Sequence, residues 1–148
     1  MAVILTGVFT NKGREVLAKS FGKKGGFDLS FASYFKYGMG GWIMTPAGKI
    51  PKDPSPALLD VEATGEPGNI WYRKELTELD FTFVPPSIMQ VRCMLSGIEA
   101  NDDGTGEAPR FFEIGVFDEN DNMLVYATMA EETKTPNKLL TNYVQAYF

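Results

Sequence analysis

Three carboxylates near the middle of the chain, Glu75, Glu78 and Asp80, come closest in type and spacing to an enzyme's acid–base pair. Glycosidases use two carboxylates about 5–10 Å apart. On one face of a strand, Glu78 and Asp80 would lie about 7 Å apart. Such pairs are common on solvated strand faces, and the neighbouring sequence indicates no cleft. We therefore favour a solvated strand face and expect a protein that is not an enzyme and has no catalytic residue.

The absence of histidine restricts the remaining chemistry. It excludes Ser-His and Cys-His nucleophiles and every His-containing metal site. Residues 118–122 (DENDN) and 101–104 (NDDG) are rich in the oxygen ligands that Ca²⁺ prefers, but the first run does not fit the EF-hand pattern. For both runs we favour plain turns over cation sites, and we expect neither a metal nor a cofactor.

The composition indicates one domain, residues 1–148, that folds around its own core. A chain of 148 residues with 44% hydrophobic content is large enough to do so without disulfide bonds. The lone Cys93 permits no internal disulfide. An aromatic content of 13% favours an all-β fold over a helical bundle.

The charge and hydropathy patterns argue against two classes of partner. The chain has 14 basic and 19 acidic residues, a formal net charge of -5, which disfavours nucleic-acid binding because that requires clustered Lys and Arg. No apolar run approaches the ~20 residues of a membrane helix, and residues 1–5 are too short and uncharged for a signal peptide. We expect no nucleic acid and no membrane, and a protein made and at first kept in a cytosol.

One short α-helix is expected near the front of the chain, at about residues 10–21. Thr10 and Asn11 offer an N-cap. Leu17 and Phe21 then fall on one helical face, and Gly22 suits the C-terminal stop. The helix is the only one that the sequence predicts.

The clearest element is a β-hairpin at about residues 111–129. Two apolar arms flank the DENDN break, whose Asp and Asn residues tolerate the positive φ of a tight reversal. Alternation puts two sets of side chains on opposite faces of the first arm: Phe112, Ile114 and Val116 on one, and Phe111, Glu113, Gly115 and Phe117 on the other. We expect Ile114 to point into the core and the other face to be partly covered. Glu113 should tolerate Gln far better than Ile114 tolerates Ala, unless Glu113 pairs with a partner subunit.

Alternating residues predict further strands at 27–31, extending toward residue 37, and at 70–84, 89–95 and 139–148. Prolines and glycines predict a long ordered loop at about residues 42–69, because proline denies donors to a strand ladder. Together these elements predict a mainly β fold, an antiparallel β-sandwich or small barrel, with one short N-terminal α-helix.

Large apolar residues at and beside the 42–69 loop are the best candidates for binding. Aromatic side chains dominate interface hot spots, and long loops are usually functional. Trp71 and Tyr72 could equally be core residues at the start of a strand. The candidate interaction residues are Trp42, Ile43, Met44, Trp71 and Tyr72. A monomer rarely exposes so much apolar surface without a binding role, so we also expect self-association or a partner.

The order of these elements resembles a known protein family. The helix reads TNKGREVLA, a strand ends in a glycine cluster at YFKYGMGG, and a proline-rich stretch leads to WYRKEL. The hairpin FEIGVFDENDNMLVYA is similar to the "reIGlFDedGnLia" motif in the N-terminal attachment domain of phage tail-collar and tail-fibre proteins. That family typically has Gly in the turn, where this chain has residues 120–122 (NDN).

The resemblance implies a structural virion protein of a phage tail or baseplate. Fibres of that family continue into long repeats after this domain, whereas the sequence ends at Phe148, which favours a short adaptor that attaches tail fibres or a receptor-binding protein. It implies assembly in the host cytoplasm, localisation in the virion tail, and partners among the fibre and other tail or baseplate proteins. Because such fibres are trimeric, it also implies a homo-oligomer, with a trimer favoured.

Two other functions remain open from the residues. A carbohydrate-binding β-sandwich module could use the region of Trp42 and Trp71 as an aromatic platform. A small β-barrel could hold an apolar ligand in a closed cavity. The first of these two would bind glycans as a monomer, and the second would show an apolar cavity.

Overall fold

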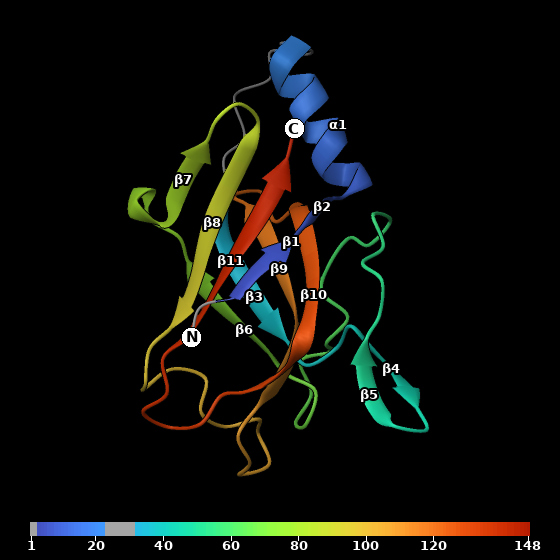
Figure 1. The fold of residues 1–148 in the computed structure, drawn as a ribbon, viewed down its shortest axis with the longest axis vertical. Coiled ribbons are helices and arrows are strands. Elements are labelled where there is room, and N and C mark those ends of the chain that lie inside the picture. Colours follow the sequence, from blue (N-terminus) through green and yellow to red (C-terminus); the bar gives the residue numbers. More distant parts are fainter. Residues whose placement is uncertain (1–2, 23–31) are drawn as a thin grey trace.

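A computed structural model describes residues 3–22 and 32–148. It shows a mainly β protein with one α-helix at the front of the chain, as the sequence predicts (Figure 1). Helix α1 spans Asn11–Gly22 and the 3-10 helix η2 spans Glu78–Asp80. The strands are β1 (Val3–Thr6), β2 (Val8–Phe9), β3 (Ala32–Gly38), β4 (Trp42–Thr45), β5 (Gly48–Pro51), β6 (Trp71–Glu75), β7 (Phe81–Val84), β8 (Ile88–Leu95), β9 (Arg110–Asp118), β10 (Met123–Thr133) and β11 (Leu140–Tyr147).

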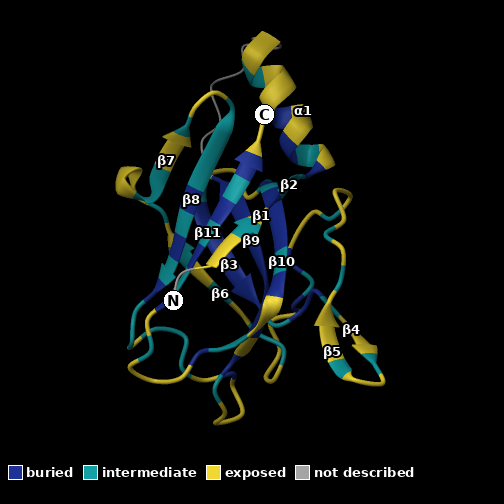
Figure 2. Ribbon diagram, in the orientation of Figure 1, coloured by how far each residue is buried: buried dark blue, intermediate teal, exposed yellow. Residues whose placement is uncertain are grey.

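Two sheets pack over a shared core. One has the order β1-β11-β8-β7 and the other β2-β10-β9-β3-β6, while β4 and β5 pair with each other. Their facing side chains form one buried cluster, to which every second residue of the central strands contributes. Among its members are Phe35 and Tyr37 of β3, Cys93 of β8, Ile114 of β9 and Val144 of β11. Figure 2 shows the burial concentrated in these central strands.

The chain crosses between the two sheets at both sides of the sandwich. At one side, β1 in the first sheet leads through Gly7 to β2 in the second; at the other, β6 leads through η2 to β7. A Cβ on Gly7 would lie 2.5 Å from Val125 Cγ1, so only glycine fits this corner. These crossings bridge the sheet edges, which gives the sandwich the character of a flattened barrel.

The pairing is not wholly antiparallel. Strand β1 pairs in parallel with β11, whereas the sequence predicts antiparallel strands throughout. The other ladders are antiparallel. Because β1 and β11 lie near the two ends of the chain, no short turn joins them, and only a short turn forces adjacent strands to run antiparallel.

Helix α1 confirms the prediction for residues 10–21, and Thr10 is its cap. The backbone N–H of Gly13 donates to Thr10 Oγ1 at 2.8 Å, and the same hydroxyl donates to the carbonyl of Met123 on β10. A Cβ on Gly13 would lie 2.4 Å from the Leu124 carbonyl oxygen. Glycine in the first turn therefore allows the helix to approach β10 closely.

Two predicted segments are divided differently in the structure. Residues 70–84 form not one strand but β6 and β7, which belong to different sheets, and η2 between them places Glu78 and Asp80 off any strand face. The Asp80 carboxylate accepts hydrogen bonds from the Thr77 N–H and from Arg92, which stabilises this corner. The 42–69 loop contains the β4–β5 hairpin. The predicted strand at 27–31 lies outside the described residues.

The predicted hairpin at 111–129 is confirmed as β9 and β10, and β11 and β8 confirm the strands at 139–148 and 89–95. Asp118 accepts hydrogen bonds from the N–H groups of Asn120 and Asn122, and Asp121 has a φ of 63°. Phe111 and Phe112 exchange the predicted faces: Phe111 lies in the core between the sheets, and Phe112 packs near Trp42. A register shift in β10 between Thr128 and Glu132 accompanies this exchange.

Candidate protein interaction surface

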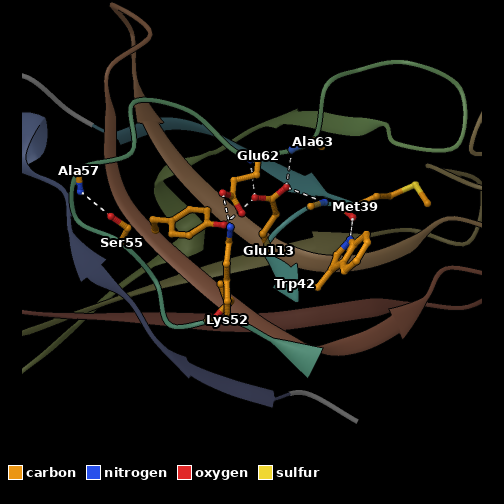
Figure 3. A network of polar contacts seen from close by, with 11 residues as sticks. Met39, Trp42, Lys52, Ser55, Ala57, Glu62, Ala63 and Glu113 are labelled. Atoms are coloured by element: carbon orange, nitrogen blue, oxygen red, sulfur yellow. Dashed lines mark hydrogen bonds and ion pairs between the residues drawn. The ribbon is translucent and has the colours of Figure 1, made fainter. Parts of the chain in front are cut away.

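A long excursion between β3 and β6 leaves the sandwich and returns to it at one buried carboxylate, Glu113. Glu113 Oε2 accepts hydrogen bonds from the backbone N–H groups of Gly40 and Ala63, each at 2.9 Å. Glu113 Oε1 accepts from the Glu62 N–H at 2.7 Å and from the Tyr126 hydroxyl at 2.8 Å. Figure 3 shows these contacts converging on the carboxylate. Glu113 therefore holds the excursion at residue 40, near its start, and again at residues 62–63.

Glu113 is enclosed by protein and fully buried, so it cannot meet a substrate in this structure. Burial raises the pKa of Glu113, and the hydrogen bonds from Glu62, Tyr126, Ala63 and Gly40 counter part of that rise. Burial, and then the nearby Glu113 carboxylate, raise the pKa of the Tyr126 hydroxyl far above its ordinary value. The Glu113 carboxylate therefore serves to hold the backbone at residues 40, 62 and 63.

The remainder of the excursion covers the outer face of the five-stranded sheet. Val61 and Ala63 are buried against Tyr34 and Phe117 of that face. Lys36, on β3, forms an ion pair with Asp60 at 3.1 Å. The face of β9 opposite the inter-sheet core is therefore covered by chain, as the sequence predicts.

The β4–β5 hairpin is the part of the excursion that projects from the body of the protein (Figure 1). Its base is held by the Lys52 N–H, which donates to the Gly41 carbonyl at 3.0 Å, and by the Thr128 hydroxyl, which donates to the Lys52 carbonyl at 2.7 Å. The Trp42 indole N–H donates to the Met39 carbonyl at 2.8 Å. An isolated two-stranded hairpin is marginally stable in water, so these contacts fix its direction.

Both faces of this hairpin carry exposed apolar side chains. Ile43 and Ile50 are opposite one another across the two strands and are 47% and 42% exposed. Met44, on the other face, is 65% exposed. Trp42 is half-buried, and Lys49 Nζ lies 4.0 Å from the centroid of its ring. Three of the predicted interaction residues, Trp42, Ile43 and Met44, thus lie together on one projecting element.

Trp71 and Tyr72 do not join this surface as one platform, because consecutive residues of β6 point to opposite faces of the sheet. Trp71 lies on the outer face, where Lys36 Nζ is 4.1 Å from its ring centroid. Tyr72 packs against the inter-sheet core, and its hydroxyl donates to Glu99 Oε2 at 3.3 Å. Of the two interpretations left open for Tyr72, the structure supports the core residue.

The Glu99 carboxylate joins the two sheets near Tyr72. Glu99 Oε1 accepts hydrogen bonds from Lys74 Nζ of β6 at 2.8 Å and from the Ser96 N–H, beyond β8, at 2.9 Å. Partial burial raises the pKa of Glu99, but the hydrogen bonds from Lys74 and Ser96 outweigh it and lower the pKa to about 2. The ionised form is therefore the one that the folded protein stabilises.

Glu99 should make the stability of the protein fall in acid. A carboxyl group whose pKa is lower in the folded than in the unfolded chain stabilises the fold above the unfolded pKa, near 4.5, and that contribution disappears as the pH falls toward 2. Urea melts from pH 7 to pH 2 should show Glu99→Gln less stable than wild type at pH 7, with the difference shrinking in acid. A pH-independent difference would contradict this assignment. Glu66→Gln, at an exposed site, is the control.

An apolar groove lies at the end of the sandwich near α1, β7 and the C-terminus. It encloses about 640 Å³, within the ~300–1,000 Å³ range of ligand pockets. Its walls are Phe9, Leu17, Ala32, Glu78, Phe81, Thr82, Phe83, Met89, Val116, Leu124, Val125 and Phe148. Sequence reasoning missed the groove because its lining comes from segments far apart in the chain.

The described residues contain no group of three or more His, Cys, Asp or Glu side chains placed to hold a metal ion. In the 118–122 turn, Asp118 accepts hydrogen bonds from the backbone of the turn itself.

Within the same described residues, none of the helices is both long and apolar enough to cross a membrane. The structure therefore presents two candidate binding sites: the β4–β5 hairpin, which could contact another protein, and the groove, which could hold an apolar ligand or side chain.

Comparisons with family models, with curated proteins and with solved structures each returned no significant match.

Proposed function

We propose that this protein is a structural adaptor of a phage tail or baseplate, which attaches tail fibres or a receptor-binding protein through protein–protein contacts and catalyses nothing. The observation that carries the proposal is the projecting β4–β5 hairpin, with Ile43, Met44 and Ile50 exposed on an arm that is anchored at its base. Such an arm suits docking between subunits, because a backbone that is already anchored loses little entropy on binding.

Two features of the central hairpin support the link to tail attachment domains. The segment FEIGVFDENDNMLVYA, which resembles the hairpin motif of that family, forms β9 and β10 at the centre of the five-stranded sheet. The Asx-rich residues at 118–122 form a tight turn without the family's glycine, because Asp121 itself adopts the left-handed conformation. The adaptor is proposed to be a homo-oligomer, with a trimer favoured, located in the virion tail and assembled in the host cytoplasm.

The apolar groove favours one alternative, binding of a small apolar ligand. Its lining is mostly aromatic and aliphatic, which is typical of such sites. The carbohydrate-binding alternative, which would use the region of Trp42 and Trp71, stays a hypothesis: Trp42 lies on the β4–β5 hairpin and Trp71 on the outer face of β6. Binding of fluorescent fatty acids or sterols by the isolated protein at micromolar concentration would favour the ligand-binding alternative.

The adaptor function can be tested in purified phage tails. Mass spectrometry should detect the protein in the particles, and negative-stain images with labelled antibody should place it where the fibres attach. A variant with Ile43→Ser, Met44→Ser and Ile50→Ser should fold but should be missing from the particles. A matched variant with Leu59→Ser and Leu139→Ser, at exposed sites outside the hairpin, should be incorporated. Full incorporation of the hairpin variant, or absence of the wild type from tails, would count against the proposal.

A further inference from the structure

The same chain carries both a projecting apolar arm and an apolar groove, and the two lie apart. Figure 1 places α1, β7 and the C-terminus toward one end of the long axis and the β4–β5 hairpin toward the other. The groove lies between α1 and β7, with Leu17 and Phe83 among its walls. The arm therefore cannot reach the groove of its own molecule but could reach that of a neighbour.

The surfaces of the arm and the groove are chemically complementary. Residues 42–51 contain one charged side chain, Lys49, and otherwise present Ile43, Met44 and Ile50 to solvent. Among the described residues, the groove is lined mostly by apolar side chains, and Glu78 is the one charged residue of that lining. Both Lys49 and Glu78 are exposed in the isolated chain, and no ion pair of the described residues involves either of them.

Two aromatic walls of the groove are exposed to solvent in the isolated chain. Phe83 is 67% exposed, although it is a wall of the groove, and Phe148 is also exposed. Together with the other apolar lining residues they form a contiguous apolar surface, and such surfaces mark interaction sites. The arm offers apolar side chains on both of its faces, so that it could be enclosed on two sides.

We propose that the β4–β5 hairpin of one copy of this chain binds in the apolar groove of the next copy, with Lys49 of the arm paired to Glu78 at the groove. This inference rests on the proposed self-association of the adaptor and specifies its geometry. The two contacting surfaces differ, so the interface is heterologous. Head-to-tail contacts of this kind build closed rings when the rotation between subunits closes, and filaments when it does not.

The arrangement can be tested by disabling one surface at a time. An arm variant carries Ile43→Asp and Met44→Asp, and a groove variant carries Phe83→Asp, all at exposed positions. Each variant alone should sediment as a monomer at tens of micromolar, where the wild type forms an oligomer. Mixed in equal amounts, they should form a 1:1 dimer, because one intact arm can still bind one intact groove. Circular dichroism and melting of each variant control for folding.

Charge reversal provides a second and milder test. Lys49→Glu should weaken self-association about tenfold or more, because it places two like charges across the interface. Adding Glu78→Lys to the same chain should restore association, since each arm then meets a lysine in the neighbouring groove. A 1:1 mixture of arm and groove variants that stays monomeric, or a groove variant that self-associates like the wild type, would overturn the proposal. The presence of the protein in tails tests the adaptor function separately.

Discussion

Replacing Glu113 by Ala should destabilise the protein by several kcal/mol, roughly 3–5, because three backbone donors lose their buried acceptor at once. The substitution leaves the N–H groups of Gly40, Glu62 and Ala63 without their acceptor, and each buried unsatisfied group costs about 1–3 kcal/mol. The loss should appear in urea melts at pH 7. Faster amide exchange should appear at residues 40, 62 and 63 before global unfolding, because the carboxylate holds the excursion at these residues.

Glu113→Gln separates the charge and acceptor roles of this side chain from its volume. Oε1 and Oε2 each accept two hydrogen bonds, whereas the Gln amide nitrogen can only donate. Gln must therefore turn a donor toward at least one backbone N–H, and we expect a loss of about 1–3 kcal/mol. The sequence predicts that Glu113 tolerates Gln far better than Ile114 tolerates Ala, and the buried hydrogen bonds of Glu113 narrow that expected difference. A Gln variant as stable as the wild type would show that the hydrogen bonds to the Glu113 carboxylate contribute little to the stability of the protein.

Tyr126→Phe is the matched control for the Glu113 variants. It removes only the hydroxyl that donates to Glu113 Oε1, and leaves the three backbone donors with their acceptor. We expect a loss of about 1–2 kcal/mol and no faster amide exchange at residues 40, 62 and 63. Equal effects of Tyr126→Phe and Glu113→Ala would argue that the carboxylate acts through Tyr126 alone.

Replacing Ile114 by Ala should cost about 2–5 kcal/mol, through lost transfer free energy and the cavity left behind. Ile114 is 0% exposed in the core between the sheets, where the sequence predicts it. Such a loss is a large share of the ~5–15 kcal/mol stability of a typical domain. The variant should therefore be insoluble, or should unfold at a much lower urea concentration than the wild type.

Ile98→Ala is the matched control, because it removes the same atoms from a side chain that is 88% exposed. Its cost should stay within about 0.5 kcal/mol, as for most surface substitutions. If Ile114→Ala also cost less than about 1 kcal/mol, the side chain would not be buried. The register of β9 against β3 and β10 would then be shifted by one residue, which moves every side chain to the other face.

The elements with local causes could be predicted from the sequence. The β9–β10 hairpin follows from alternation and from the turn chemistry of Asp and Asn, all within one short segment. Helix α1 follows from the Thr10 cap and the residues just after it. The mainly β fold follows in turn, because the segment of β8 carries its own alternation pattern, as the central hairpin does, whereas β4 and β5 lie in a segment predicted as loop.

Whether two strand-like segments form one strand or two was decided by the tertiary structure. Residues 78–83 alternate and 70–84 is predicted as one strand, yet the chain changes sheets at η2, where Thr77 and Asp80 form a capping box. The exchange of Phe111 and Phe112 likewise accompanies a register shift in the opposite strand, β10. The partner strand, and not the segment itself, determines which of two adjacent aromatic residues is enclosed.

By itself, the sequence determined which residues are apolar enough to form an interaction surface, and Trp42, Ile43 and Met44 do lie together on a projecting hairpin. The sequence could not show that Glu113 is a buried hydrogen-bond acceptor, because an isolated Glu on a strand is typical of a solvated or partly covered side chain. Its partners lie 73, 51, 50 and 13 residues away along the chain. Only folding brings those four donors to one carboxylate. The groove has the same origin, since its lining runs from Phe9 to Phe148 and exists only where the sheets, α1 and the last residue meet.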